Sequence, residues 1–529
     1  MLARRPGSRF ACYTERSDRM APRETARAAG RGLLWITSAK LYFILAGYTV
    51  QLALPRLFGS AATFGLYSTA MSQAAIVNNV LIAATLQTVS KHVSEDAEHA
   101  AARLRQGLRV QLVLGLVLCG LVLALAPLIA ELILDDAIEP LLRIASAVVF
   151  CYALYAALIG SLNGRQLFRR QAQLDMLFTT LRTIGILGCA AAGLGVVGAM
   201  MGFAGAAMVL LVVSLALVGT GTRGHSHVPW KRWLGFMAPL WVYQGFLNGA
   251  LQIDLSVLKR TVAELAIAQG ALADIARHQA SSYVGYYKAA QTFAFVPYQL
   301  VLSVTFVVFP MVSMAIQGGE HEQARTYIRA AMRFSLLVLV AVAAPIAGAA
   351  RGVMLLAYQP DYVVGAPALT VLIIGIVMFA LFVVAATVLS GSGSPRTAAT
   401  IAGTSLLVVM LAVHSLVRWV GVGEHTLVAA ACGTSAGTAF ALAASGVSVF
   451  GRFGTFIPIL SVLRALCAGA LAYASAHFLP HESKLQTLVA LAAGAAVYGA
   501  ALVVTRELGR QDLQAVVTLV RRDSRPPGR

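Results

Sequence analysis

The sequence predicts an all-α, polytopic membrane protein with fourteen transmembrane helices, and three observations support this. Hydrophobic residues make up 58% of the 529 residues and charged residues 12%, whereas soluble proteins average about half and about a quarter. Apolar runs of about 20 residues, the length of helix that crosses the roughly 30 Å hydrocarbon core of a bilayer, recur along the chain. The net charge is +19, and the basic residues responsible for it lie mostly in short loops and at the two ends. A soluble globular chain and a disordered chain are therefore excluded.

Each apolar run lies between charged or turn-forming residues and predicts one helix. The fifth and sixth runs are separated only by the turn at Gly193 to Gly198. In order, the fourteen runs cover residues 33–54, 64–89, 110–131, 140–162, 174–195, 197–218, 233–257, 284–309, 333–355, 364–390, 397–417, 425–447, 456–478 and 486–505.

The distribution of basic residues supports this count, because Lys and Arg gather in the cytoplasmic loops of membrane proteins. With the N-terminus inside, the cytoplasmic segments hold 29 basic residues and the external segments hold seven. We therefore expect a multi-pass protein of the bacterial inner (plasma) membrane with both termini in the cytoplasm. Anionic lipids are its expected electrostatic partners, at roughly 1 kcal/mol for each cation near the surface. A nucleic-acid partner is not expected.

Three segments fall outside the spans. Residues 1–32 and 506–529 are expected to be basic cytoplasmic tails, with Met20 an alternative start to Met1. Residues 259–282 are Ala-rich, carry scattered charge and are too polar to span. For this external insertion we expect a helix lying along the membrane interface, and the alternative is a lid over the substrate.

Two pairs of motifs recur at a nearly constant offset, which indicates an internal repeat. Phe64–Met71 opens the second span and Val284–Gln291 opens the eighth, 220 residues later. In the loops that follow these spans, Glu98–Arg103 and Glu320–Arg325 are 222 residues apart. An even number of crossings separates the copies, so the two halves have the same orientation in the membrane.

Parallel repeats of this kind are one way in which transporters build a central cavity between two lobes. We therefore expect an N-lobe of six helices over residues 33–218 and a C-lobe of six helices over residues 219–447. The last two helices, within residues 448–505, have no counterpart in the repeat and are expected to be appended.

The sequence also resembles a known family. Leu54–Tyr67 (LPRLFGSAATFGLY), Thr88–Lys91, Val284–Ala290 and Phe309-Pro310 are similar to the oligosaccharide-lipid flippases of polysaccharide biosynthesis. That family belongs to the multidrug/oligosaccharidyl-lipid/polysaccharide exporter superfamily, with the multidrug extruders and the lipid II flippases. The resemblance covers spans one to twelve, and the insertion at 259–282 departs from it. It implies fourteen helices, alternating access, no cofactor, and a cargo of polyprenyl phosphate- or pyrophosphate-linked glycan for a surface polysaccharide such as lipopolysaccharide.

Two cations inside spans are candidates for binding the lipid phosphate. A charge at the centre of a span costs about 2.5 to 3.5 kcal/mol on insertion scales, so those present are functional candidates. Lys40 lies about seven residues into the first span and Arg182 about eight into the fifth, which predicts both in the cytoplasmic half. In the resembling flippases, cations that line the central cavity receive the phosphate. The alternatives are an ion pair with Asp175 and snorkelling to the headgroups.

Three amides in the seventh span are candidates for binding sugar. Gln244, Asn248 and Gln252 recur at intervals of four residues, which places their side chains along one face of a helix. Amides can hydrogen-bond to the hydroxyl groups of a glycan.

A second pair of charges lies about one turn from the outer face, Asp254 in span seven and Lys288 in span eight. Lys288 replaces Ser68 of the first repeat, so the charge belongs to the second lobe alone. The two residues are candidates for a structural ion pair, and the alternative is a carboxylate that responds to protons or sodium during transport.

Several other functions lack their sequence signals. None of the six lysines follows a glycine, so there is no phosphate-binding loop of an ATPase, and no catalytic triad or metal-ligand cluster appears. We expect a flippase, not an enzyme, that works with a polysaccharide polymerase and glycosyltransferases. One alternative is a multidrug or cation antiporter of the same superfamily, whose cargo a cationic cavity would repel. The other is a membrane glycan polymerase or glycosyltransferase, which would need a larger external loop.

Overall fold

The computed structural model describes residues 22–222, 228–318, 320–480 and 482–507, so most of both predicted tails lies outside the described residues. The described residues form α-helices joined by short turns, with one 3₁₀ helix and no strand. The elements are α2 (Pro22–Phe58), α3 (Ala61–Ser94), α4 (Ala100–Ile133), α5 (Ile138–Gly164), α6 (Phe168–Ala191), α7 (Gly195–Val218), α8 (Trp230–Ala268), α9 (Ala273–Ala294), α10 (Val296–Gln317), α11 (His321–Gly348), α12 (Ala350–Ala357), η1 (Pro360–Gly365), α13 (Ala366–Gly391), α14 (Pro395–Val420), α15 (Thr426–Phe453), α16 (Ile459–Phe478) and α17 (Lys484–Val504).

The prediction of an all-α, multi-pass membrane protein is confirmed. Twelve of the described helices are long and apolar enough to cross a membrane. The more polar α8 and the consecutive α9 and α10 occupy the places of the seventh and eighth predicted spans, so fourteen crossings agree with the structure. Span eight is not one continuous helix, because the chain turns at Phe295 between α9 and α10.

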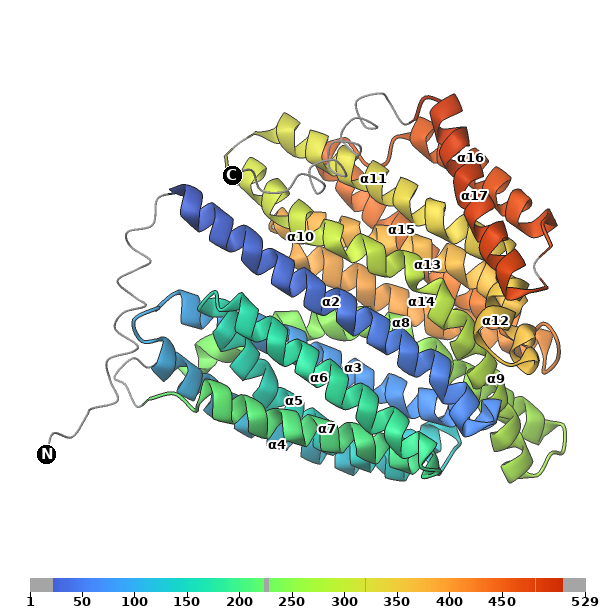
Figure 1. The fold of residues 1–529 in the computed structure, drawn as a ribbon, viewed down its shortest axis with the longest axis horizontal. Coiled ribbons are helices and arrows are strands. Elements are labelled where there is room, and N and C mark those ends of the chain that lie inside the picture. The colour runs from blue at the N-terminus through green and yellow to red at the C-terminus, as the bar shows by residue number, and fades with distance from the viewer. Residues whose placement is uncertain (1–21, 223–227, 319, 481, 508–529) are drawn as a thin grey trace, which may run out of the picture.

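The helices form two lobes that lie side by side (Figure 1). In the N-lobe, α5 packs against α3, α4 and α7, and α6 packs against α2 and α7. In the C-lobe, α15 packs against α13 and α14, and α13 also packs against α10 and α11. The appended α16 and α17 pack against each other and against α11, on the outside of the C-lobe.

The expectation of a separate interfacial helix at 259–282 is wrong. Residues up to Ala268 continue α8 without a break, and α9 begins at Ala273 after a short turn. The segment is therefore the turn of an antiparallel helix pair together with the ends of its two helices. Its polar composition has a structural cause, because charged residues of this segment contact the opposite lobe.

The two lobes meet where α3 of the N-lobe packs against α8 and α9 of the C-lobe. The glycines of the two repeat motifs lie at this contact. A Cβ atom on Gly65 would lie 1.8 Å from the carbonyl oxygen of Ser281, and one on Gly285 would lie 2.1 Å from the carbonyl oxygen of Ala61. Glycine is required at both positions because two helix backbones touch there. The repeated motif therefore marks the crossing of the two halves.

Candidate functional site

The helices that carry the two candidate cations, α2 and α6, are neighbours that run in the same direction (Figure 1). The guanidinium of Arg169 lies 5.5 Å from the ring of Trp35 near the start of the contact. Further along, the Tyr42 hydroxyl lies 2.8 Å from Oγ1 of Thr180. The structure therefore brings Lys40 and Arg182 onto adjacent helices.

Arg182 lies among aromatic rings inside the N-lobe. Its guanidinium carbon is 5.7 Å from the ring centre of Phe43 on α2 and 5.2 Å from that of Phe203 on α7. Such contacts stabilise a cation by about 0.5 to 2 kcal/mol. Tyr67 of α3 and Tyr152 of α5 are also close enough to interact with its charge. Aromatic side chains of four helices thus surround this one cation.

Two features of Arg182 matter for binding an anion. Its Nε atom is buried and has no hydrogen-bond partner, and a buried donor without an acceptor is unfavourable. An incoming phosphate oxygen would supply the missing acceptor. Arg182 lies nine residues before the end of α6 at Ala191. The helix begins six residues earlier than the apolar run suggested, so the side chain lies past its midpoint.

Lys40 has a different environment. Its side chain is exposed on α2, and the carboxylate of Asp175 on α6 interacts with its charge. Asp175 also accepts a hydrogen bond of 2.8 Å from the hydroxyl of Tyr155. The structure thus places Lys40 beside an anion, as the ion-pair alternative requires. The local charge around Lys40 is balanced, whereas Arg182 has an unused donor.

The predicted amide face of α8 meets α3 of the opposite lobe. Asn248 donates from Nδ2 to the carbonyl oxygen of Gln244 at 2.9 Å. Its Oδ1 accepts a hydrogen bond of 3.0 Å from Nδ2 of Asn79. Six residues earlier on α3, Gln73 donates to Oγ of Ser256 on α8 at 2.5 Å. Polar side chains of the two lobes therefore join in pairs, and Gln252 lies on the same partly buried stretch of α8.

The sequence reasoning did not identify the α3 partners of these amides. The two α3 residues that bond to α8, Gln73 and Asn79, lie within the second apolar run, as do the amides Asn78 and Gln87. Polar residues inside a span are the same signal that identified Gln244, Asn248 and Gln252, so a search of every span for amides would have found them.

Asp254 is completely buried and lies at the junction of three C-lobe helices. Its carboxylate accepts hydrogen bonds from the hydroxyl of Tyr287 at 3.1 Å, from Nε2 of Gln291 at 3.2 Å and from Oγ1 of Thr434 at 3.2 Å. The N–H of Leu255 adds a fourth at 2.9 Å. These donors come from α8, α9 and α15, so Asp254 fastens the three helices together.

Lys288 is linked to Asp254 through a third residue. Its Nζ donates to Oε1 of Gln291 at 2.8 Å, while Nε2 of Gln291 donates to Asp254. The two charges are thus neighbours across an amide and do not form a direct ion pair. Their electrostatic interaction remains through the amide, and a role of Asp254 in coupling stays a prediction.

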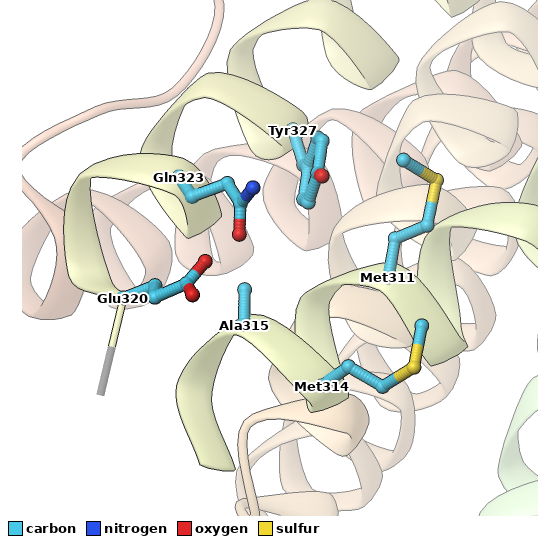
Figure 2. Close-up of a pocket in the computed structure, with 6 residues that line it drawn as sticks. All are labelled: Met311, Met314, Ala315, Glu320, Gln323 and Tyr327. Atoms are coloured by element: carbon cyan, nitrogen blue, oxygen red, sulfur yellow. The ribbon is translucent and has the colours of Figure 1, made fainter. Parts of the chain in front are cut away.

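A pocket of about 210 Å³ lies elsewhere, between the end of α10 and the start of α11 (Figure 2). The carboxylate of Glu320 and the amide of Gln323 face its interior (Figure 2). None of the predicted site residues lines it. Its lining residues are Met311, Met314, Ala315, Glu320, Gln323 and Tyr327. Among the described residues, no group of three or more His, Cys, Asp or Glu side chains could hold a metal ion.

Comparison by sequence gives one family match. Residues 29–316 match the family described as "Polysaccharide biosynthesis protein", which is more than half of the chain. No curated protein matches the sequence.

Comparison by structure finds membrane transporters. The lipid II flippase MurJ in an inward closed conformation superimposes with a TM-score of 0.73 and 14% identity, covering 90% of this chain and 100% of that one. A multidrug resistance MATE family transporter in an inward-facing conformation gives a TM-score of 0.60 and 17% identity, covering 77% and 98%. A MOP superfamily transporter from Pyrococcus furiosus gives 0.57 and 15%, covering 80% and 95%. At these identities the likeness concerns the fold.

Proposed function

We propose that this chain, which belongs to the polysaccharide biosynthesis protein family, carries a lipid-linked oligosaccharide as its cargo. It is a membrane transporter and not an enzyme. The glycan would be carried on a polyprenyl phosphate or pyrophosphate and moved across the membrane by rocking of the two lobes. The proposed membrane is the bacterial inner membrane, with both termini in the cytoplasm. Glycosyltransferases would supply the cargo, and a polysaccharide polymerase would consume it.

The environment of Arg182 carries this proposal. A phosphate that crosses the hydrocarbon needs charge-assisted hydrogen bonds, which are about twice as strong as those between neutral groups. A guanidinium presents its donors in a fork that matches phosphate. Arg182 offers a buried Nε without an acceptor, whereas Lys40 already has Asp175 beside it. Arg182 is therefore the proposed primary contact, and Lys40 would contribute when Asp175 is neutralised or moves away.

The amides that join the lobes are the proposed sugar contacts. Gln244, Asn248 and Gln252 of α8 lie on the helix that meets α3, where Asn79 donates to Asn248. Opening the space between the lobes would separate Asn79 from Asn248 and release their hydrogen-bonding groups. Sugar hydroxyls could then bind to amides that had been paired with each other.

A drug or cation exporter is the competing function, because a MATE transporter shares the fold. The guanidinium of Arg182 opposes it, since an unbalanced cation repels a cationic drug. Coupling of transport to protons, sodium or the membrane potential is part of the proposal, with Asp254 and Lys288 as the ionisable pair of the C-lobe.

The proposal predicts that Arg182→Ala reduces glycan export more than Arg182→Lys. Loss of one charge-assisted contact of about 1.5 to 3 kcal/mol corresponds to roughly 10- to 100-fold. The measurement is surface polysaccharide, and lipid-linked precursor left inside, in cells that depend on this protein. Arg109→Ala, an exposed arginine of α4, is the control and should export normally. Normal export by Arg182→Ala at normal protein level would remove Arg182 from the site.

A further inference from the structure

At the end of the bundle where α8 turns into α9, the C-lobe contacts an acidic turn of the N-lobe. This turn joins α4 to α5 and contains Asp135 and Asp136. Nζ of Lys259 on α8 lies 2.5 Å from Oδ2 of Asp135, and the two side chains are 1% and 6% exposed. An ion pair that excludes water in this way is strong only while both partners stay in place.

Two further contacts surround this buried pair. Nη2 of Arg277 on α9 donates to Oδ2 of Asp136 at 2.7 Å. Nη1 of Arg260 on α8 donates to the carbonyl oxygen of Leu132 at 3.1 Å. All the acceptors belong to one short stretch of the N-lobe, and all the donors belong to the C-lobe segment 259–282. Each of the three contacts therefore crosses from one lobe to the other.

Most of these groups also have a partner within their own lobe. Arg260 donates to Glu264 at 2.6 Å and Arg277 to Asp274 at 3.4 Å, both on the same helix as the arginine. Oδ1 of Asp135 accepts the N–H of Ala137 at 3.0 Å. When the lobes separate, these charges keep a local partner and gain water. Contacts of this kind can therefore form and break repeatedly as the lobes move. A permanent structural bridge would not need these local partners.

We propose that Asp135, Asp136, Lys259, Arg260 and Arg277 form a latch that holds the two lobes together at this end of the bundle. This inference rests on the proposed rocking of the lobes, and it assigns the contacts that control opening at this end. While the latch is closed, α8 and α9 stay against the α4–α5 turn, and the space between the lobes cannot open there. Breaking it favours the conformation that is open at this end.

Distances between spin labels test the latch directly. Labels at Ala192, in the α6–α7 turn, and at Leu272, in the α8–α9 turn, lie at this end on different lobes, and both positions are exposed. Double electron–electron resonance on the full chain in lipid nanodiscs would give the distance distribution without any substrate. We expect Arg277→Gln to increase the population of longer distances severalfold.

Further variants test whether the change in distance comes from loss of these specific contacts. The double variant Asp135→Asn/Lys259→Met removes the buried pair without leaving an isolated charge, and should lengthen the distances more than Arg277→Gln does. The exchange Asp136→Arg/Arg277→Asp should restore the native distribution. Arg143→Gln is the matched control, because Arg143 pairs with Glu139 at the same end but within α5, and it should change nothing.

The latch is overturned if Arg277→Gln and the double variant both give the native distribution in folded protein, or if the exchange variant fails to restore it. This test is independent of the test of the proposed cargo. The distances are measured on protein alone, so a shift in distances together with normal export by Arg182→Ala would keep the latch and reject the phosphate site.

Discussion

Two ionisable side chains inside the bundle differ in how their charge is satisfied. Asp254 accepts four hydrogen bonds, from three side chains and one backbone N–H. Arg182 has aromatic neighbours and a buried Nε without a partner. A fully bonded buried charge fastens its surroundings, whereas an unsatisfied one inside a span points to a ligand. The hydrogen bonds of each residue therefore distinguish a structural role from a ligand-binding role better than its position in the sequence does.

The motif glycines give a prediction at the same scale. Gly65→Ala would place a Cβ atom 1.8 Å from a backbone oxygen of α9, so the helices must shift apart. Overpacking of this kind costs typically about 1–3 kcal/mol. We expect a lower midpoint of thermal unfolding in detergent. The control is Gly47→Ala on α2, where a Cβ meets nothing within 4 Å; there the midpoint should stay or rise. Equal midpoints for both variants would contradict the close crossing of α3 and α9.

The site residues could be predicted from the sequence only in part. Charge and amide content identified Lys40, Arg182 and the α8 stripe, because such groups are costly in a span wherever they point. Their partners could not be predicted in the same way. Asp175 lies 135 residues from Lys40, and Asn79 lies 169 residues from Asn248. Such pairs depend on the rotation of each helix about its axis, which the apolar pattern of a span leaves open.

At the scale of elements, one buried carboxylate links the appended helices α16 and α17 to the C-lobe, in addition to their packing against α11. Glu507 follows α17 and its side chain is 3% exposed. Its Oε1 accepts a hydrogen bond of 2.7 Å from Arg333 on α11, and its Oε2 one of 2.9 Å from Arg464 on α16. The residue thus ties both appended helices to the C-lobe.

Replacing this carboxylate should destabilise the protein in a pH-dependent way. Burial alone would raise the pKa of Glu507, but hydrogen bonds from Ser461, Arg333 and Arg464 lower it overall. A group with a lowered folded pKa stabilises fully above its unfolded value, and this stability is lost as the pH falls through the folded one. We expect Glu507→Gln to cost about 1.5–3 kcal/mol near pH 7.

The measurement is the unfolding midpoint of Glu507→Gln and of native protein across pH. The difference between them should be constant at neutral pH and shrink as the pH falls below 4.5, the usual pKa of the group. Glu98→Gln, an exposed carboxylate, serves as the control. A difference that grows on acidification would contradict the assigned role.

The segment 259–282 shows where sequence patterns stop being informative about elements. A polar, Ala-rich helix has the same composition whether it lies along a membrane or extends a spanning helix beyond it. The deciding contact joins Lys259 to Asp135, 124 residues earlier. No local pattern contains that pairing, so only the folded chain assigns the segment to α8 and α9.

At the scale of the whole molecule, the architecture followed from the sequence because the bilayer restricts the choices. A spanning chain must satisfy its backbone hydrogen bonds internally, which leaves helices of known length. The repeat then divides those helices into two lobes, and its motif glycines lie where the lobes touch. Contacts such as that of Arg277 with Asp136 also join the lobes, and the repeat itself does not encode them.

Transport by the purified protein tests the central claim most directly. The protein would be reconstituted in liposomes with a fluorescent glycan on a polyprenyl pyrophosphate. The fraction of the label that is accessible to a quencher added outside the liposomes would be followed over time. The account predicts transfer of this anionic lipid across the bilayer, slowed roughly 10- to 100-fold by Arg182→Ala, and no transfer of a cationic dye. Transport of the dye, with the anionic lipid left in its original leaflet, would contradict the account.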